Sequence, residues 1–110
     1  MDEETRNQIN LELTRGWEAH EQGLEGRARV HARRAAGIAA RIFLHNRGSD
    51  FTRNAYDALR QIVASPAVSA RARQAAQALT LRVDVTFQLP VHLNLLEEAQ
   101  YLIDELLPKY

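Results

Sequence analysis

The sequence has no cysteine among its 110 residues. This absence excludes disulfide frameworks, thiol nucleophiles and zinc sites built on cysteine. The chain also has no apolar run that approaches the roughly 18 residues needed for a membrane-spanning helix. Its first residues, MDEETRNQ, are acidic rather than apolar. We therefore expect a cytoplasmic protein with no secretory signal and no contact with a membrane.

Other absences narrow the possible functions. The chain has no glycine-rich phosphate loop and no Ser-His-Asp signature. His31 and His45 are not at metal-binding spacing, and no carboxylate completes a metal set with them, so we expect neither a metal nor a cofactor. Aromatic residues make up only 6% of the chain, which counts against recognition of single-stranded nucleic acid by base stacking.

The apolar periodicity divides the chain into helices. The predicted helices cover residues 3–22, 25–44, 54–64, 69–85 and a last segment that opens at Asn94 and ends at Pro108. Residues 84–93 alternate like a strand, but one short strand has no partner with which to form a sheet. There we expect a frayed helix end and an extended turn around Pro90. The predicted fold is all-α, an up-and-down bundle of four to five helices in a single domain, 1–110.

The predicted helix ends depend on local residues. Gly48 is a glycine of the kind that terminates a helix, and Ser69 is a predicted N-cap. Asn94, with Glu97 three residues later, resembles a capping box. The connection near residues 22–26 is short, so the first two helices should pack antiparallel.

Residues 25–44 form the helix around which the bundle is organised. Its packing stripe consists mostly of alanine, which lets a neighbouring backbone come close. The stripe comprises Ala28, Ala32, Ala35, Ala39, Ile42 and Phe43. Gly16, in the middle of the first helix, costs about 1 kcal/mol relative to alanine. We therefore expect the alanine stripe to press closely against it.

Charge is segregated along the chain although the total is zero. Residues 1–25 carry a net charge of −5, residues 26–82 of +9 and residues 83–110 of −4. On the central helix, Arg27, Arg34 and Arg41 form a row at steps of seven. In one interpretation, the acidic outer helices pair with this basic one inside the bundle. In the other, part of the arginine surface meets phosphate or an acidic partner.

A second apolar line lies opposite the alanine stripe and consists of Val30, Gly37 and Leu44. A solvated face would normally carry charged or amide side chains there. The line therefore predicts a homodimer whose seam contains these three residues, with Gly37 allowing close approach of the partner backbone. The alternative is that the third or fourth helix of the same chain folds over this line.

Three segments resemble the HEPN family, a family of helical domains named for nucleotide binding in higher eukaryotes and prokaryotes. AHEQGLEGRARVHARRAAGIAARIFL (19–44) resembles its second helix, rich in small residues and entered from a turn that contains glycine. NAYDALRQI (54–62) resembles the short third helix, and FQLPVHLNLLEEAQYLIDEL (87–106) resembles the proline turn and last helix, including the pair Glu98–Ala99. Together with the order of the helices, the resemblance covers nearly the whole chain.

The resemblance also implies a test of activity. Active HEPN nucleases cut RNA with an arginine followed, after four to six residues, by a histidine. Such a pair can hold a phosphate and exchange a proton near neutral pH. Here Arg82 and His92 are separated by nine residues, and Gln88 stands where many relatives carry an arginine before the turn. The resemblance therefore implies a protein that is not an enzyme.

One literal match to the nuclease spacing exists, Arg15 followed after four residues by His20. It lies in the first helix, where five positions turn the chain by about 140°, so the two side chains diverge. His20 falls on the apolar stripe of that helix, and we expect a buried, hydrogen-bonded histidine. Trp17 is expected in the core.

Three functions from different classes remain as hypotheses. The first is a non-catalytic HEPN-like interaction protein, since such relatives often act with a small nucleotidyltransferase as a toxin–antitoxin or accessory pair. The second is a nucleotide- or RNA-binding bundle that uses Arg27, Arg34 and Arg41. The third is a ribonuclease that uses residues other than the family motif.

Overall fold

The computed structural model describes residues 2–49, 54–81 and 94–107. Helices account for all the regular structure in these ranges, which confirms the predicted all-α bundle. The helices are α1 (Glu3–Glu21), α2 (Glu25–Asn46), α3 (Ala55–Val63), α4 (Ala70–Thr80) and α5 (Leu95–Leu106). The fourth helix was predicted to reach residue 85 but ends at Thr80, where Leu81 turns to extended backbone. The predicted turn around Pro90 lies outside the described residues.

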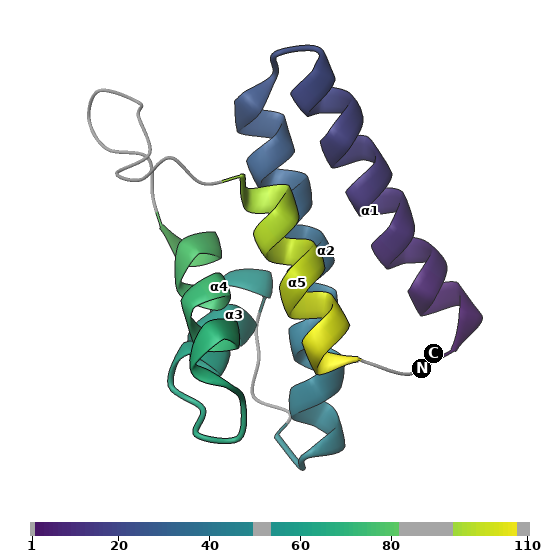
Figure 1. Cartoon of the computed structure of the whole chain (residues 1–110). Coiled ribbons are helices and arrows are strands. Elements are labelled where there is room, and N and C mark those ends of the chain that lie inside the picture. The colour runs from purple at the N-terminus through teal and green to yellow at the C-terminus, as the bar shows by residue number, and fades with distance from the viewer. Residues whose placement is uncertain (1, 50–53, 82–93, 108–110) are drawn as a thin grey trace.

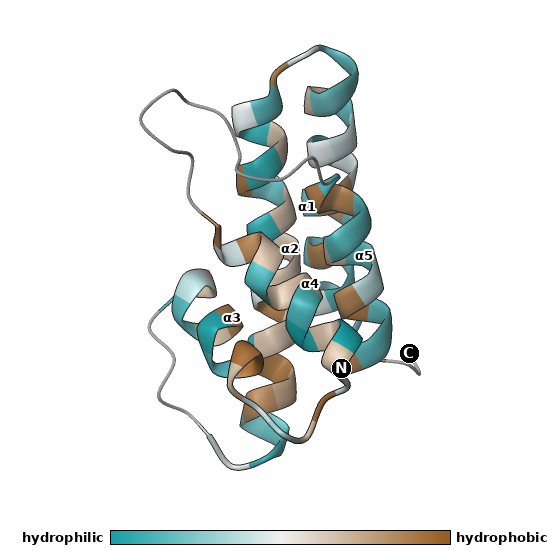
Figure 2. Ribbon diagram, turned by 60° about the vertical axis from the view of Figure 1, so that its left-hand side comes forward, coloured by the Kyte–Doolittle hydropathy of each residue, from teal (hydrophilic) through white to brown (hydrophobic). Residues whose placement is uncertain are grey.

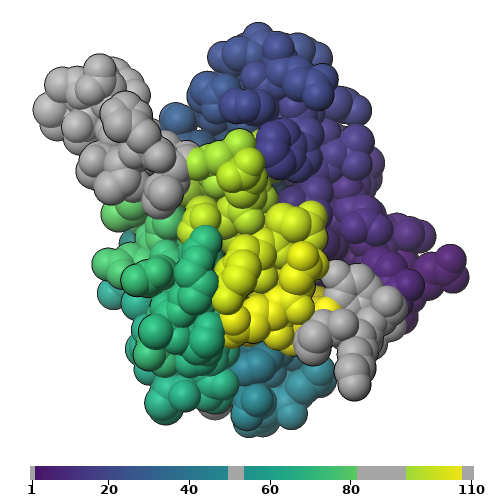
Figure 3. All heavy atoms as spheres, in the orientation of Figure 1, coloured from purple at the N-terminus to yellow at the C-terminus, as the bar shows by residue number. Residues whose placement is uncertain are grey.

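α2 is the central element and contacts all four other helices. α1 packs antiparallel along it through the short connection 22–24, as predicted (Figure 1). α3 and α4 pack on the other side of α2, and α5 fills the surface between α1 and α4 (Figure 3). One long helix is therefore surrounded on most of its circumference by its own chain.

Alanine lets α2 serve as this centre. Its alanines at 32, 35, 36, 39 and 40 have no solvent exposure, so the helices around α2 can approach its backbone closely. The largest fully buried side chains come from the surrounding helices: Leu59, Ile62, Leu79, Leu102 and Ile103. Hydrophobic residues accordingly alternate with hydrophilic ones along α5 and gather where the helices face each other (Figure 2).

Gly16 is buried where three helices meet. A Cβ at this position would meet the Leu96 side chain of α5 and would lie 3.2 Å from the Cβ of His31 on α2. The predicted close approach at Gly16 is therefore present. The neighbours are a leucine of the last helix and a histidine of α2, however, rather than the alanine stripe.

The helix ends follow local capping chemistry. Side chains of Asp2, Asn54, Ser69 and Asn94 accept hydrogen bonds from backbone N–H groups in the first turns of α1, α3, α4 and α5, and this confirms the caps predicted at Ser69 and Asn94. α2 ends at the predicted glycine, because Gly48 has φ +85°. The N–H of Ser49 bonds to Leu44 O at 2.9 Å and that of Gly48 to His45 O, which is a Schellman motif. Gly23 ends α1 in the same way.

The C-terminal half of α5 is tied to the N-cap of α4. The Ser69 hydroxyl donates to the Glu105 carboxylate at 2.7 Å and accepts from the N–H of Ala72 at 3.0 Å. The Tyr101 hydroxyl donates to the same carboxylate at 2.9 Å. Burial raises the pKa of Glu105, but the hydrogen bonds from Ser69 and Tyr101 outweigh this effect and leave the pKa below its ordinary value.

Glu105→Gln should therefore make the protein's stability less dependent on pH. Because the folded state depresses the pKa, the ionised carboxylate stabilises the fold above its unfolded pKa of about 4.3. That contribution disappears as the pH falls through the folded pKa. Urea unfolding should show the variant less stable than wild type at pH 7, with the difference shrinking towards pH 3. Glu97→Gln, an exposed change on the same helix, is the control for removing one negative charge.

Candidate functional site

The candidate site is the arginine row, which we define as Arg27, Arg34 and Arg41 on α2. All three side chains are exposed. A step of seven residues is nearly two helical turns, so the three guanidinium groups lie on one side of α2 over roughly 21 Å. Val30, which lies between Arg27 and Arg34 in the sequence, is also 40% exposed, so α2 faces solvent there.

The acidic helices do not neutralise this row. Within the described ranges, no hydrogen bond or ion pair involves Arg27, Arg34 or Arg41. Pairing between acidic and basic helices does occur elsewhere, since Arg71 on α4 contacts Glu98 on α5 through two hydrogen bonds of 2.9 and 2.8 Å. The interpretation that charges pair inside the bundle therefore applies to Arg71 but not to the row.

Other arginines of the basic segment have structural roles. Arg33 donates from Nε to Leu79 O at 2.6 Å and from Nη2 to Leu81 O at 2.7 Å. Arg73 donates to the carbonyls of Ser65 and Val68 in the loop before α4. Spacing places Arg27, Arg34 and Arg41 in one row, but the sequence does not show which other arginines bind backbone carbonyls, because that depends on the helices that surround them.

The predicted dimer seam is largely covered by the chain itself. Gly37 is buried, and a Cβ added to it would meet the Cβ of Ala55 and lie 2.8 Å from that residue's Cα. Leu44 is 7% exposed and belongs to the core, so only Val30 remains exposed. At Gly37 the structure agrees with the alternative, in which a helix of the same chain folds over the line. A homodimer remains a prediction, but Gly37 and Leu44 are not available to form its seam.

His20 departs from its predicted environment. It is exposed rather than buried, and its Nδ1 lies 2.8 Å from Glu25 Oε1. Its ring meets that of Trp17 edge to face, with centroids 5.7 Å apart. The predicted hydrogen bond is present, but the last turn of α1 extends to where no other helix covers this side. Trp17 is half-buried against the core.

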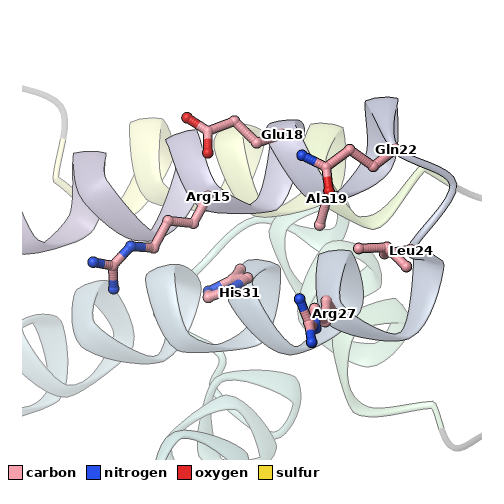
Figure 4. Close-up of a pocket in the computed structure, with 7 residues that line it drawn as sticks. All are labelled: Arg15, Glu18, Ala19, Gln22, Leu24, Arg27 and His31. Atoms are coloured by element: carbon pink, nitrogen blue, oxygen red, sulfur yellow. The ribbon is translucent and has the colours of Figure 1, made fainter.

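A hollow of about 190 Å³ lies between α1 and α2, next to the start of the arginine row. It is lined by Arg15, Glu18, Ala19, Gln22, Leu24, Arg27 and His31. His31 lies between the guanidinium groups of Arg15 and Arg27, while the Glu18 carboxylate points away from α2 (Figure 4). Sequence reasoning missed this grouping, because Arg15 and His31 come from different helices and no local spacing relates them.

The positions compared with the family's nuclease motif have no described structure here. Arg82, Gln88 and His92 all lie outside the described residues. Among the residues that are described, no group of three or more histidine, aspartate or glutamate side chains is arranged to hold a metal ion. No helix in the described ranges has both the length and the apolar content to cross a membrane.

Comparisons with protein-family models, with curated proteins and with solved structures find no match for this chain.

Proposed function

We propose that this protein is a non-catalytic, HEPN-like interaction protein that docks through its arginine row onto an acidic surface of a partner protein. The observation that carries the proposal is that three exposed guanidinium groups on one helix face have no counter-charge in the described part of the chain. Such a row produces a positive potential that steers and orients an acidic partner. The helix order, two long antiparallel helices followed by shorter ones, supports the HEPN-like assignment.

The surface around the row favours a protein over a nucleic acid. None of the aromatic side chains in the described ranges is exposed, so this part of the chain offers no platform on which bases could stack. Exposed apolar side chains do lie on α2 and beside it, at Val30 and Leu24. Arginine combined with apolar contact area is typical of protein–protein interfaces. By resemblance to the family, a nucleotidyltransferase encoded by a neighbouring gene is the first partner to test.

The proposal is tested with three tagged baits in the native cell: wild type, R27Q/R34Q/R41Q, and R15Q/R47Q/R60Q. The last variant removes the same charge from exposed arginines outside the row. A specific protein should be retained by the wild type and the control, survive nuclease treatment, and be lost from the row variant. Its affinity should fall with added salt, because the row is exposed. Both triple variants should retain their helix content by circular dichroism.

Two other outcomes would indicate a different function. If nuclease treatment removes everything that the wild type retains, and purified RNA binds with a steep salt dependence that the row variant loses, the row binds nucleic acid. If the purified protein cleaves RNA and His92→Ala or Arg82→Ala abolishes the cleavage, the protein is a ribonuclease. Equal retention of partners by the row variant and the wild type would contradict any role for the row.

A further inference from the structure

We propose that the hollow between α1 and α2 binds a phosphate group, either free or as a phosphate monoester, through Arg15, Arg27 and His31. This proposal does not depend on the docking surface proposed above. The hollow and that surface share Arg27 only, because Arg34 and Arg41 do not line the hollow.

Two guanidinium groups supply the charge. Arg15 comes from α1 and Arg27 from α2, and both side chains are exposed, with no hydrogen bond or ion pair to any residue in the described ranges. A guanidinium presents its N–H groups in a planar fork that matches two oxygens of a phosphate. Figure 4 shows the two guanidinium groups on opposite sides of His31, so an anion bound beside the His31 ring would lie between them and would give both arginines a counter-charge.

His31 supplies an oriented ring nitrogen. Its Nδ1 lies 2.7 Å from Oε2 of Glu12, and the side chains of the two residues are 17% and 18% exposed. An ionised carboxylate can only accept hydrogen bonds, so the proton of this bond is on Nδ1. The bond fixes the orientation of the ring and leaves Nε2 available to a ligand. A bound phosphate can then form a hydrogen bond with Nε2 while Glu12 continues to accept from Nδ1.

The remaining lining residues limit what the hollow accepts. Glu18 is the one acidic side chain of the lining, and its carboxylate points away from α2 (Figure 4), so it does not take the place of an anion between the helices. The volume of about 190 Å³ lies below the roughly 300–1,000 Å³ of pockets that enclose whole drug-sized molecules. The hollow therefore fits a tetrahedral oxyanion, and the rest of a larger ligand would remain outside it.

The test is a titration of the full chain with inorganic phosphate at constant ionic strength, followed by NMR of the His31 ring and the arginine Nε–H groups. We expect saturable shifts at His31, Arg15 and Arg27, with a Kd on the order of 1 mM. Arg15→Gln should weaken binding about ten- to hundredfold, because it removes a charged hydrogen-bonding group. R34Q/R41Q, which lowers the charge of α2 without touching the lining, should bind like the wild type.

Three results decide the proposal. Saturable binding of inorganic phosphate, with or without binding of ribose 5-phosphate, supports it, and the second probe shows whether the phosphoryl end of an ester is also accepted. The absence of saturable shifts with either probe overturns it. Equal weakening by R34Q/R41Q and Arg15→Gln also overturns it, since diffuse attraction to α2 would then explain the binding. Because Arg15 is exposed, its variant should remain folded, which circular dichroism checks.

Discussion

Gly37→Arg is expected to prevent folding of this protein. Gly37 faces α3 so closely that a Cβ would meet the Cβ of Ala55 and lie 2.8 Å from its Cα. A backbone atom cannot rotate away, so the two helices would have to separate. An arginine would in addition place a charge in a position that is buried among alanines. Overpacking costs about 1–3 kcal/mol and an unsatisfied buried charge considerably more, which together approach the ~5–15 kcal/mol of a typical domain.

Gly37→Ala tests the same contact with a smaller side chain, so the variant should still fold. In a helix interior, alanine is ordinarily better than glycine by about 1 kcal/mol. At Gly37 we expect the opposite sign, a loss of at least about 1 kcal/mol in urea unfolding, because the added methyl group overpacks against Ala55. Gly26→Ala is the matched control on the same helix: its Cβ would lie 3.8 Å from the nearest side-chain atom, on Arg29, so stability should stay the same or rise.

The result also bears on how the chain assembles. A folded, monomeric Gly37→Arg protein, produced from a wild type that is dimeric by light scattering, would show that Gly37 belongs to a seam between two copies. Loss of folding in Gly37→Arg together with normal folding of Gly26→Ala supports the packing of α3 over α2 within one chain.

The features that could be predicted from the sequence are those that local chemistry determines. Ser69 and Asn94 cap helices because their side chains reach N–H groups two or three residues away, and Gly48 ends α2 because it adopts a positive φ. Each signal lies within one turn of the position that it decides. The same holds for the alanine stripe of α2, whose period alone shows that it is buried.

The features that were missed depend on which elements meet in space. The apolar periodicity of α2 indicates that the line containing Gly37 is covered. It does not show that Ala55 of α3 covers it, because the periodicity of one helix does not determine where another helix packs. His20 lies on the apolar side of α1, yet it is exposed, because the last turn of α1 lies beside α2 but beyond the first turn of α5 (Figure 1). The arginine row was evident from spacing, whereas its lack of acidic partners required the arrangement of all the helices.

Arg33 and Arg34 offer the clearest separation of structural from functional arginine. Arg33 crosses from α2 to the C-terminal end of α4 and donates to Leu79 O and Leu81 O. The last carbonyls of a helix have no partner within it, and a cation there also meets the negative end of the helix dipole. α4 has no basic residue of its own in its last turn, so Arg33 supplies both the hydrogen bonds and the charge. Arg34, the next residue, is exposed in the row.

Arg33→Gln should therefore lower the free energy of unfolding by at least about 3 kcal/mol, since hydrogen bonds to charged groups are worth about 1.5–3 kcal/mol each and the shorter side chain loses both of them. Arg33→Lys should recover only the part that comes from the dipole, because an ammonium group cannot span both oxygens as the guanidinium does. Arg34→Gln should change stability by no more than about 0.5 kcal/mol and should weaken binding of the partner. Equal stability losses for Arg33→Gln and Arg34→Gln in urea unfolding would refute this division. If only Arg33→Gln lowers stability, then a loss of partner binding in Arg34→Gln comes from the missing guanidinium on the surface of α2 and not from damage to the fold.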